Sequence, residues 1–297
     1  MKNALLLRFA CTPHGLRGVS RLLRRGQKSC AGGFTLVEIA ISLVLLSLAA
    51  VGVFAILEQQ IEQHRISDTN ATLLKAHDAV LSFVTAYGRL PCPAVVGSNG
   101  AESIASNVGG IITCTREAGF LPAVTLGMPN LDQWGLLEGA WNDGAGSQNG
   151  TFVRAIRYAV TGLAAPTAWT LTSVSLGAPG SPTQRAAVQT SFNNNQGLFV
   201  CASGAGIVAA GNRCGPVAAN TLSSNAAVII WSLGSDAADI PNYSADELQN
   251  YNLTVPRVVI NRVYAPLGAA GGQFDDLVTW ISYPIIADRL VYAGFVQ

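Results

Sequence analysis

The sequence predicts an α+β protein in which a long N-terminal helix packs on an antiparallel β-sheet. Residues 34–57 form the one long apolar run of the chain. Residues 58–87 keep apolar side chains at helical spacing, with charged residues between them. After Gly88, short β-rich runs alternate with stretches rich in Gly, Asn and Ser. We therefore expect one helix of about fifty residues, whose amphipathic second half packs against a β-rich head over 88–297.

Several segments of the head have strand-like composition or period-two alternation. They are residues 152–160, 169–176, 197–201, 226–233, 254–263 and 277–282. Residues 285–292 are expected to form a short closing helix. Residues 161–225 are rich in Ala, Ser, Thr and Gly and are expected to form an insert in the head, either a β subdomain or long surface loops.

The apolar run 34–57 has the properties of a membrane-spanning helix. It contains one acidic residue, Glu38, and no proline. A helix of this length rises about 36 Å, which is enough to cross a hydrocarbon core of about 30 Å. Residues 1–33 carry seven basic residues and no acidic one. By the positive-inside rule this predicts a cytoplasmic N-terminus and an exported C-terminal part.

The small residues Ala31-Gly32-Gly33 precede the apolar run, whereas the cleavage site of an ordinary secretory signal follows it. Cleavage between Gly33 and Phe34 would remove the basic leader and keep the helix. The string GGFTLVEIAISLVLLSLAAVG resembles the type IV prepilin signature. That resemblance implies that a prepilin peptidase cuts after Gly33 and methylates the new amino group of Phe34.

The resemblance also implies that Glu38 assists assembly. A carboxylate within an apolar helix is costly in lipid unless it is paired, and such residues are usually functional. The free amine of Phe34 in a neighbouring subunit is a natural partner for it. The alternative is an acid that is tolerated near the interface in a generic signal anchor.

The family resemblance implies a filament subunit of a type IV pilus or of a type II secretion pseudopilus. The expected partners are other pilin or pseudopilin subunits, the prepilin peptidase and the bacterial inner membrane, with the head in the periplasm or outside the cell in a filament. A head of about 210 residues favours a minor subunit, because bulky heads pack poorly along a filament. A tip adhesin that presents residues 161–225, and an anchored periplasmic protein that never assembles, remain as alternatives.

Parts of the head add to the resemblance. Leu131-Asp132-Gln133-Trp134-Gly135 with Arg157-Tyr158-Ala159-Val160, and the strand that ends in Ser232-Leu233-Gly234-Ser235-Asp236, are similar to segments of major pseudopilins. In that family a loop after this strand binds calcium, which implies a calcium site at Asp236 and Asp239. Hard cations want six or more oxygen ligands, so a solvated acidic turn is the alternative, and no other cofactor is expected.

Cysteine usage predicts disulfides in the exported part. Cys11 and Cys30 belong to the leader, and four cysteines remain in the mature chain. Of the three connectivities we favour Cys92–Cys114 with Cys201–Cys214, because each closes a loop rich in glycine and asparagine. Buried free thiols are the alternative, and the spacings do not fit a zinc site.

Charge and histidine content weigh against two function classes. Without the leader the chain has 11 basic and 17 acidic residues, a net charge of −6, which weighs against nucleic-acid binding through bulk charge. The three histidines, His14, His64 and His77, all precede the head. A histidine-based nucleophile pair in the head is therefore excluded, and we expect no enzyme activity.

Overall fold

The computed structural model describes residues 35–108, 111–131, 136–139, 154–161, 197–238, 242–253, 257–266 and 268–294. The chain divides into two compact units, Met1–Phe54 and Ala55–Gln297. Helix α1 (Leu36–Tyr87) begins in the first unit and ends in the second. Among the described residues, no helix combines the length and the hydropathy that crossing a membrane requires.

The first unit contains the beginning of α1. Thr35 lies just before the helix, and its hydroxyl accepts a hydrogen bond from the backbone N–H of Glu38 at 3.3 Å. Its carbonyl oxygen accepts from the same N–H at 3.0 Å and from that of Ile39 at 3.2 Å. Amides in the first turn of a helix have no partner within the helix, so Thr35 satisfies two of them and fixes where α1 starts.

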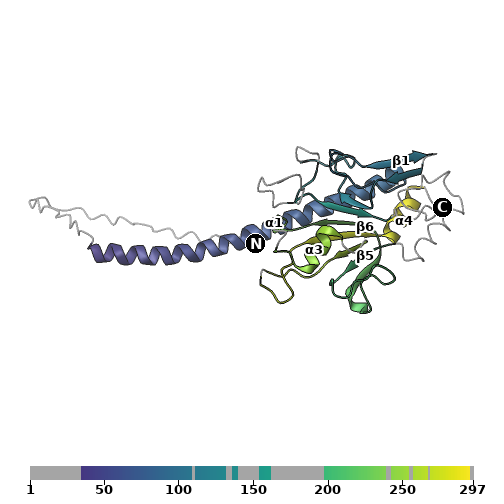
Figure 1. Ribbon diagram of the computed structural model, residues 1–297. Helices are drawn as coiled ribbons and strands as arrows, with labels where there is room; N and C mark the ends of the chain where they lie inside the picture. Colours follow the sequence, from purple (N-terminus) through teal and green to yellow (C-terminus); the bar gives the residue numbers. More distant parts are fainter. Residues whose placement is uncertain are drawn as a thin grey trace, which may run out of the picture. The chain divides into compact units, whose positions relative to one another are not determined.

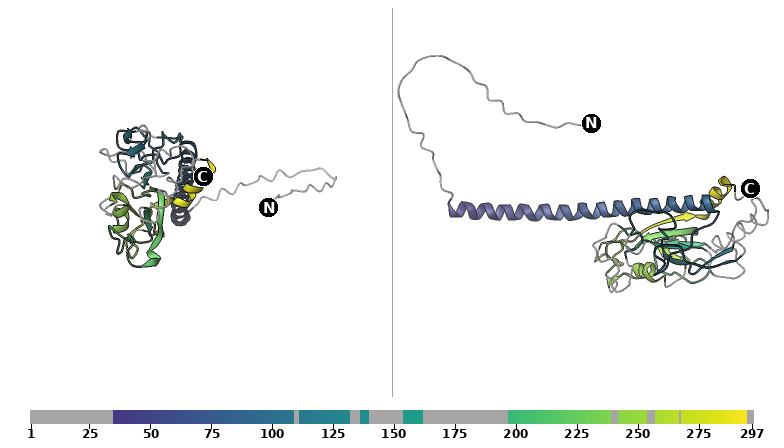
Figure 2. Two further views of the ribbon diagram at one scale, coloured as in Figure 1. Left: turned by 90° about the vertical axis from the view of Figure 1, so that its right-hand side faces the viewer. Right: turned by 90° about the horizontal axis from the view of Figure 1, so that it is seen from above.

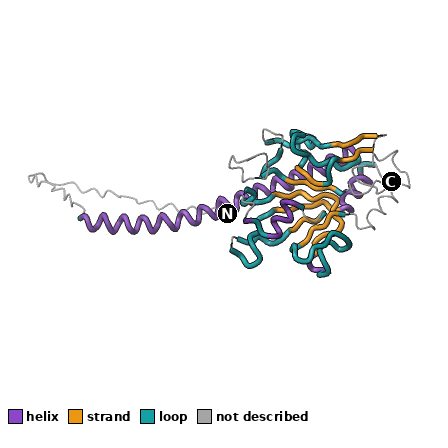
Figure 3. The backbone as a smooth tube through the Cα atoms, viewed as in Figure 1, coloured by secondary structure: helices purple, strands orange, loops and turns teal. Residues whose placement is uncertain are grey.

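The second unit is an α+β head around one central sheet (Figures 1 and 3). The sheet order is β3-β4-β6-β5-β7, and β8 pairs with β6. A separate two-stranded sheet is formed by β1 and β2. The strands are β1 (Ile104–Val108), β2 (Ile111–Cys114), β3 (Ala118–Phe120), β4 (Arg157–Val160), β5 (Leu198–Cys201), β6 (Thr221–Ser232), β7 (Val258–Ile260) and β8 (Leu277–Ser282). The remaining helices are η1 (Ala218–Asn220), α3 (Ala245–Asn252) and α4 (Tyr283–Tyr292).

The sheet is mixed, so the expectation of a purely antiparallel head is wrong. β5 and β7 are parallel, whereas the other pairs of the central sheet are antiparallel. The reason lies in β6, which pairs with β4, β5 and β8. The chain that returns from α3 therefore adds beyond β5, and since it runs opposite to β6 it is parallel to β5. Parallel neighbours need a long connection, which β6 and α3 supply.

The two faces of the sheet bury different sets of side chains. Tyr158 and Ile230 belong to the cluster that packs on the second half of α1 and on α4, through residues such as Leu73. Ala159 and Trp231 belong to a second cluster, against which residues of α3 and the turn after it pack. This alternation follows from the period of two along a strand. Helices α1 and α3 therefore cover opposite faces of the sheet (Figure 2).

The segment 161–225 is not a separable insert along its whole length. Residues 162–196 lie outside the described part of the chain, as does the expected strand 169–176. However, β5 and the first residues of β6 are strands of the central sheet. All four residues of β5 are buried. An insert in this region therefore ends before Gly197.

Candidate functional site

Glu38 lies in the first turn of α1, on an exposed apolar surface. The hydroxyl of Ser42 donates to the backbone carbonyl oxygen of Glu38 at 2.7 Å. In the part of the chain that the structure describes, this carboxylate makes no hydrogen bond and no ion pair. The cleavage site at Gly33–Phe34 lies just outside the described residues.

The side chains around Glu38 form an apolar surface on every side of the helix. They are at least half exposed: Leu36, Val37, Ile39, Ile41, Leu43, Val44, Leu45, Leu46 and Leu48. A helix that is hydrophobic all round is stable only when lipid or other protein covers it. Glu38 is the one charged side chain on this apolar surface among the described residues.

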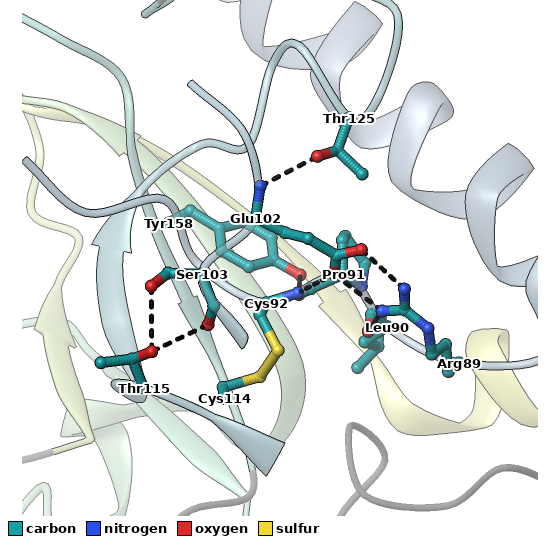
Figure 4. The surroundings of a disulfide bond; sticks show 10 residues. All are labelled: Arg89, Leu90, Pro91, Cys92, Glu102, Ser103, Cys114, Thr115, Thr125 and Tyr158. Carbon is teal, nitrogen blue, oxygen red and sulfur yellow. Dashed lines mark hydrogen bonds and ion pairs between the residues drawn. A yellow bond between two sulfur atoms is a disulfide. The ribbon is translucent and has the colours of Figure 1, made fainter. Parts of the chain in front are cut away.

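The turn after α1 is tied by a disulfide to the hairpin of β1 and β2 (Figure 4). Cys92 and Cys114 are joined, with their Cα atoms 5.3 Å apart. Arg89 donates two hydrogen bonds to the carboxylate of Glu102, at 2.8 and 2.6 Å. The same carboxylate accepts from the backbone N–H of Cys92 at 3.0 Å. Tyr158 on β4 is fully buried, and its hydroxyl donates to the carbonyl oxygen of Pro91 at 3.0 Å.

The second disulfide joins Cys201 at the end of β5 to Cys214, with Cα atoms 5.4 Å apart. Both sulfur pairs are the ones that the loop composition favoured. Cys92–Cys114 links the turn after α1 to the end of β2, and Cys201–Cys214 links the end of β5 to the loop before η1. A cross-link stabilises mainly by restricting the unfolded chain.

Three acidic residues from distant parts of the head meet at one end of the sheet. Asp236 follows β6, Glu247 lies in the first turn of α3, and Asp275 precedes β8. One carboxylate oxygen of each lies within 4.8 Å of the other two. Sequence reasoning placed only Asp236 here, and its proposed partner Asp239 lies outside the described residues.

Glu247 and Asp275 each use one carboxylate oxygen to accept hydrogen bonds, while the other oxygen has no such partner among the described residues. Oε2 of Glu247 accepts from the backbone N–H of Ser244 at 2.8 Å, as half of a capping box at the start of α3. Oδ2 of Asp275 accepts from the N–H of Ser235 at 2.7 Å and from its hydroxyl. Oε1 of Glu247 and Oδ1 of Asp275 are buried and have no hydrogen-bond partner among the described residues.

Burial raises the pKa of Glu247, and the charge of Asp275 acts in the same direction, while hydrogen bonding to Ser244 and to the nearby backbone N–H of Asp275 opposes it. Burial also raises the pKa of Asp276, which accepts a hydrogen bond from Asn250 at 2.6 Å. Converging carboxylates in a buried place repel one another unless a proton or a cation is present. The cluster has the oxygen chemistry that calcium prefers.

Comparison with known protein families identifies the N-terminal part of the chain. Residues 28–54 match the family described as prokaryotic N-terminal methylation motif. Comparison with curated proteins and with solved structures gave no significant match. The matched segment contains the Gly33–Phe34 bond, Glu38 and the apolar start of α1. Residues 28–54 of this chain therefore carry the signature of type IV pilins and pseudopilins.

Proposed function

We propose that the chain is a structural filament subunit, a minor pilin or pseudopilin of a type IV pilus or a type II secretion system. The observation that carries this is the methylation motif at 28–54, which holds a single carboxylate, Glu38, on an exposed apolar helix. A structural role also fits a head whose sequence has no histidine.

In this proposal a prepilin peptidase cuts between Gly33 and Phe34 and methylates Phe34. Residues 34–57 then hold the subunit in the inner membrane, with the N-terminus on the cytoplasmic side and the head in the periplasm. This orientation follows from the seven basic residues of the leader. Assembly moves the apolar helix from lipid into a bundle of like helices, so the apolar surface stays covered throughout.

Glu38 supplies the register of assembly in the proposed filament. Its carboxylate makes no contact within the described chain, so it is available to the amine of Phe34 in a neighbouring subunit. In an apolar bundle such a pair is much stronger than in water, because the effective dielectric constant is low. A subunit that is shifted along the axis leaves both charges unpaired, which is strongly unfavourable.

The test compares Glu38→Ala with Asp68→Ala in cells that express the complete secretion or pilus machinery. Asp68 is also an exposed acid on α1, but it lies beyond the apolar run. We expect Glu38→Ala to remain in the membrane fraction and to be lost from sheared filaments. Asp68→Ala should enter filaments like the wild type. Normal incorporation of Glu38→Ala would overturn the proposed role.

We also propose that the cluster of Asp236, Glu247 and Asp275 binds calcium. Two observations favour this: the carboxylate oxygens converge within 4.8 Å, and two of the buried oxygens lack hydrogen-bond partners among the described residues. With one oxygen from each, three carboxylates supply up to half of the roughly six to eight ligands that calcium takes, and backbone carbonyls and water supply the rest in such sites. The bound ion would link the end of β6, the start of α3 and the approach to β8.

A further inference from the structure

A cavity of about 580 Å³ lies beside the edge strand β3 and the C-terminal end of α3. The sheet register pairs Phe120 with Arg157, and Arg157 with Trp231. Directly paired residues of antiparallel strands project on the same face, so the three side chains form a row across β3, β4 and β6. Trp231 is buried in the cluster against which Tyr251 and Leu253 pack, so the row lies on the face that α3 covers.

Aromatic rings hold the guanidinium group of Arg157 in place within this row. Its Cζ atom lies 5.1 Å from the centre of the Tyr251 ring and 5.8 Å from that of Phe120. Its Nη1 donates to the carbonyl oxygen of Tyr251 at 3.2 Å. Cation–π contacts of this kind orient a guanidinium without neutralising its charge. The cation is therefore positioned before any ligand arrives.

The charge of Arg157 has no anionic partner in the described chain. Nε is buried without a hydrogen-bond partner, and neither a hydrogen bond from Nη2 nor an ion pair is present among the described residues. Burial lowers the pKa of Arg157, whereas electrostatic interactions with Tyr251, Tyr243 and Asp276 raise it. Asp276 is bonded to Asn250 and makes no hydrogen bond or ion pair with Arg157 among the described residues. Placing a half-buried cation without an anion is costly, and a bound anion offsets that cost.

The lining of the cavity is positive and otherwise mainly apolar. It includes Arg157 and the exposed Arg116 but no aspartate or glutamate. Two nearby acids have partners elsewhere: Glu117 binds Arg257 at 2.5 Å and Glu102 binds Arg89 at 2.6 Å. The mature chain has a net charge of −6, so the positive charge of this cavity is opposite in sign to the net charge of the protein.

We propose that the cavity binds a small organic carboxylate with an apolar or planar body, a binding function separate from filament assembly. The carboxylate would accept hydrogen bonds from Nη2 of Arg157 and from Arg116 at the rim, and the body would lie against Val95 and Phe120. The volume is within the range of small-molecule sites, about 300–1,000 Å³. The guanidinium group of Arg157 can pair with one carboxylate, and Arg116 lies at the rim as a second donor group.

The test is a calorimetric titration of the full mature protein in detergent with benzoate and with cyclohexanecarboxylate. Benzamide and cyclohexanecarboxamide are the neutral counterparts. We expect saturable binding of at least one carboxylate and none of its neutral counterpart. Arg157→Gln should weaken binding about tenfold or more, because a charged hydrogen bond is lost. Arg116→Gln, at the exposed rim, should weaken it less, and Arg157→Lys should lie between the wild type and Arg157→Gln.

Arg289→Gln is the matched control, since Arg289 is an exposed arginine on α4 away from the cavity. It should leave binding unchanged. A melting curve for each variant separates lost binding from lost folding, and Arg116→Gln keeps the test valid if Arg157→Gln unfolds. The proposal is overturned if neither carboxylate binds the wild type. It is also overturned if folded Arg157→Gln binds as the wild type does, or if binding survives Arg116→Gln undiminished when Arg157→Gln does not fold.

Discussion

Glu247 and Asp275 direct their carboxylates to the same place, while the acid next to each in the sequence turns away. Asp246 binds Arg262 at 2.8 Å and the backbone N–H of Gly204 at 2.8 Å. Asp276 binds Asn250 at 2.6 Å. In each pair of adjacent acids, one member therefore stabilises the fold and the other joins Asp236 in the cluster.

This division predicts how calcium affects stability. Calcium should raise the melting temperature of the wild-type protein, and a chelator should lower it. A concentration of 100 times the dissociation constant contributes about 2.7 kcal/mol, or roughly 5–10 °C for a domain of this size. Glu247→Gln should abolish the shift while its amide oxygen still caps α3. Without calcium it should melt no lower than the wild type, since a negative charge has left the cluster.

Asp246→Asn is the control for that experiment. It removes the ion pair with Arg262 and should lower the melting temperature at all calcium concentrations, yet it should keep the calcium-dependent shift. A shift that disappears equally in both variants would contradict calcium binding at the cluster.

The hydrogen bond between Tyr158 and Pro91 predicts a second stability effect. Burial raises the pKa of Tyr158, so its hydroxyl stays protonated and donates. Tyr158→Phe leaves the carbonyl oxygen of Pro91 without this donor and should lower the free energy of unfolding by about 1–2 kcal/mol. Tyr292→Phe should have no effect, because that side chain is 85% exposed. Chemical denaturation of both variants gives the comparison, and equal stabilities would contradict the assigned role of the bond.

The secondary-structure elements that were predicted correctly are those determined mainly by local sequence. Residues 277–282 form β8 as expected, and the closing helix α4 covers 283–292. The hairpin of β1 and β2 was missed, because its segment is short, partly exposed and rich in Ser and Asn. A non-local disulfide holds it instead, since Cys114 is tied to Cys92, and Thr115 bonds Ser103 at the open end of the hairpin. The parallel pairing of β7 likewise depends on which edges of the sheet are already filled, which periodicity does not reveal.

The acidic cluster shows a similar limit. Glu247 follows Ser244 at the spacing of a capping box, and its Oε2 does cap α3. Its other oxygen faces Asp236 and Asp275, which are adjacent only after β6, α3 and β8 have assembled. One side chain therefore fulfils the local expectation and still has a second role that only the fold creates.

Processing gives a third prediction, at the N-terminus. Gly33→Val should block cleavage, since a branched side chain at the scissile bond hinders the close approach that glycine permits. Intact-mass measurement should find wild-type protein beginning with N-methylated Phe34 and the variant retaining residues 1–33. Gly26→Val, which changes a glycine further up the leader, should be processed normally. A mature N-terminus elsewhere than Phe34 would refute the assigned cleavage site.

The two disulfides should contribute similarly to the stability of the protein but differ in their effect on the cavity. Each closes a loop whose cross-link contributes about 3 kcal/mol in the chain-entropy model. Replacing either pair by serines should therefore lower the free energy of unfolding comparably. Only Cys92–Cys114 borders the cavity, whose lining includes Ala94 and Thr115.

Loss of the Cys92–Cys114 bond frees that rim while Arg157 stays on β4. Carboxylate binding should weaken severalfold in the Cys92→Ser, Cys114→Ser variant, because the rim must be ordered when the ligand binds. It should remain at the wild-type level in the Cys201→Ser, Cys214→Ser variant, whose disulfide does not contact the cavity. Titration with the same carboxylate, at a temperature where both variants are folded, makes the comparison. Equal losses in the two variants would mean that general destabilisation, and not the rim, controls binding.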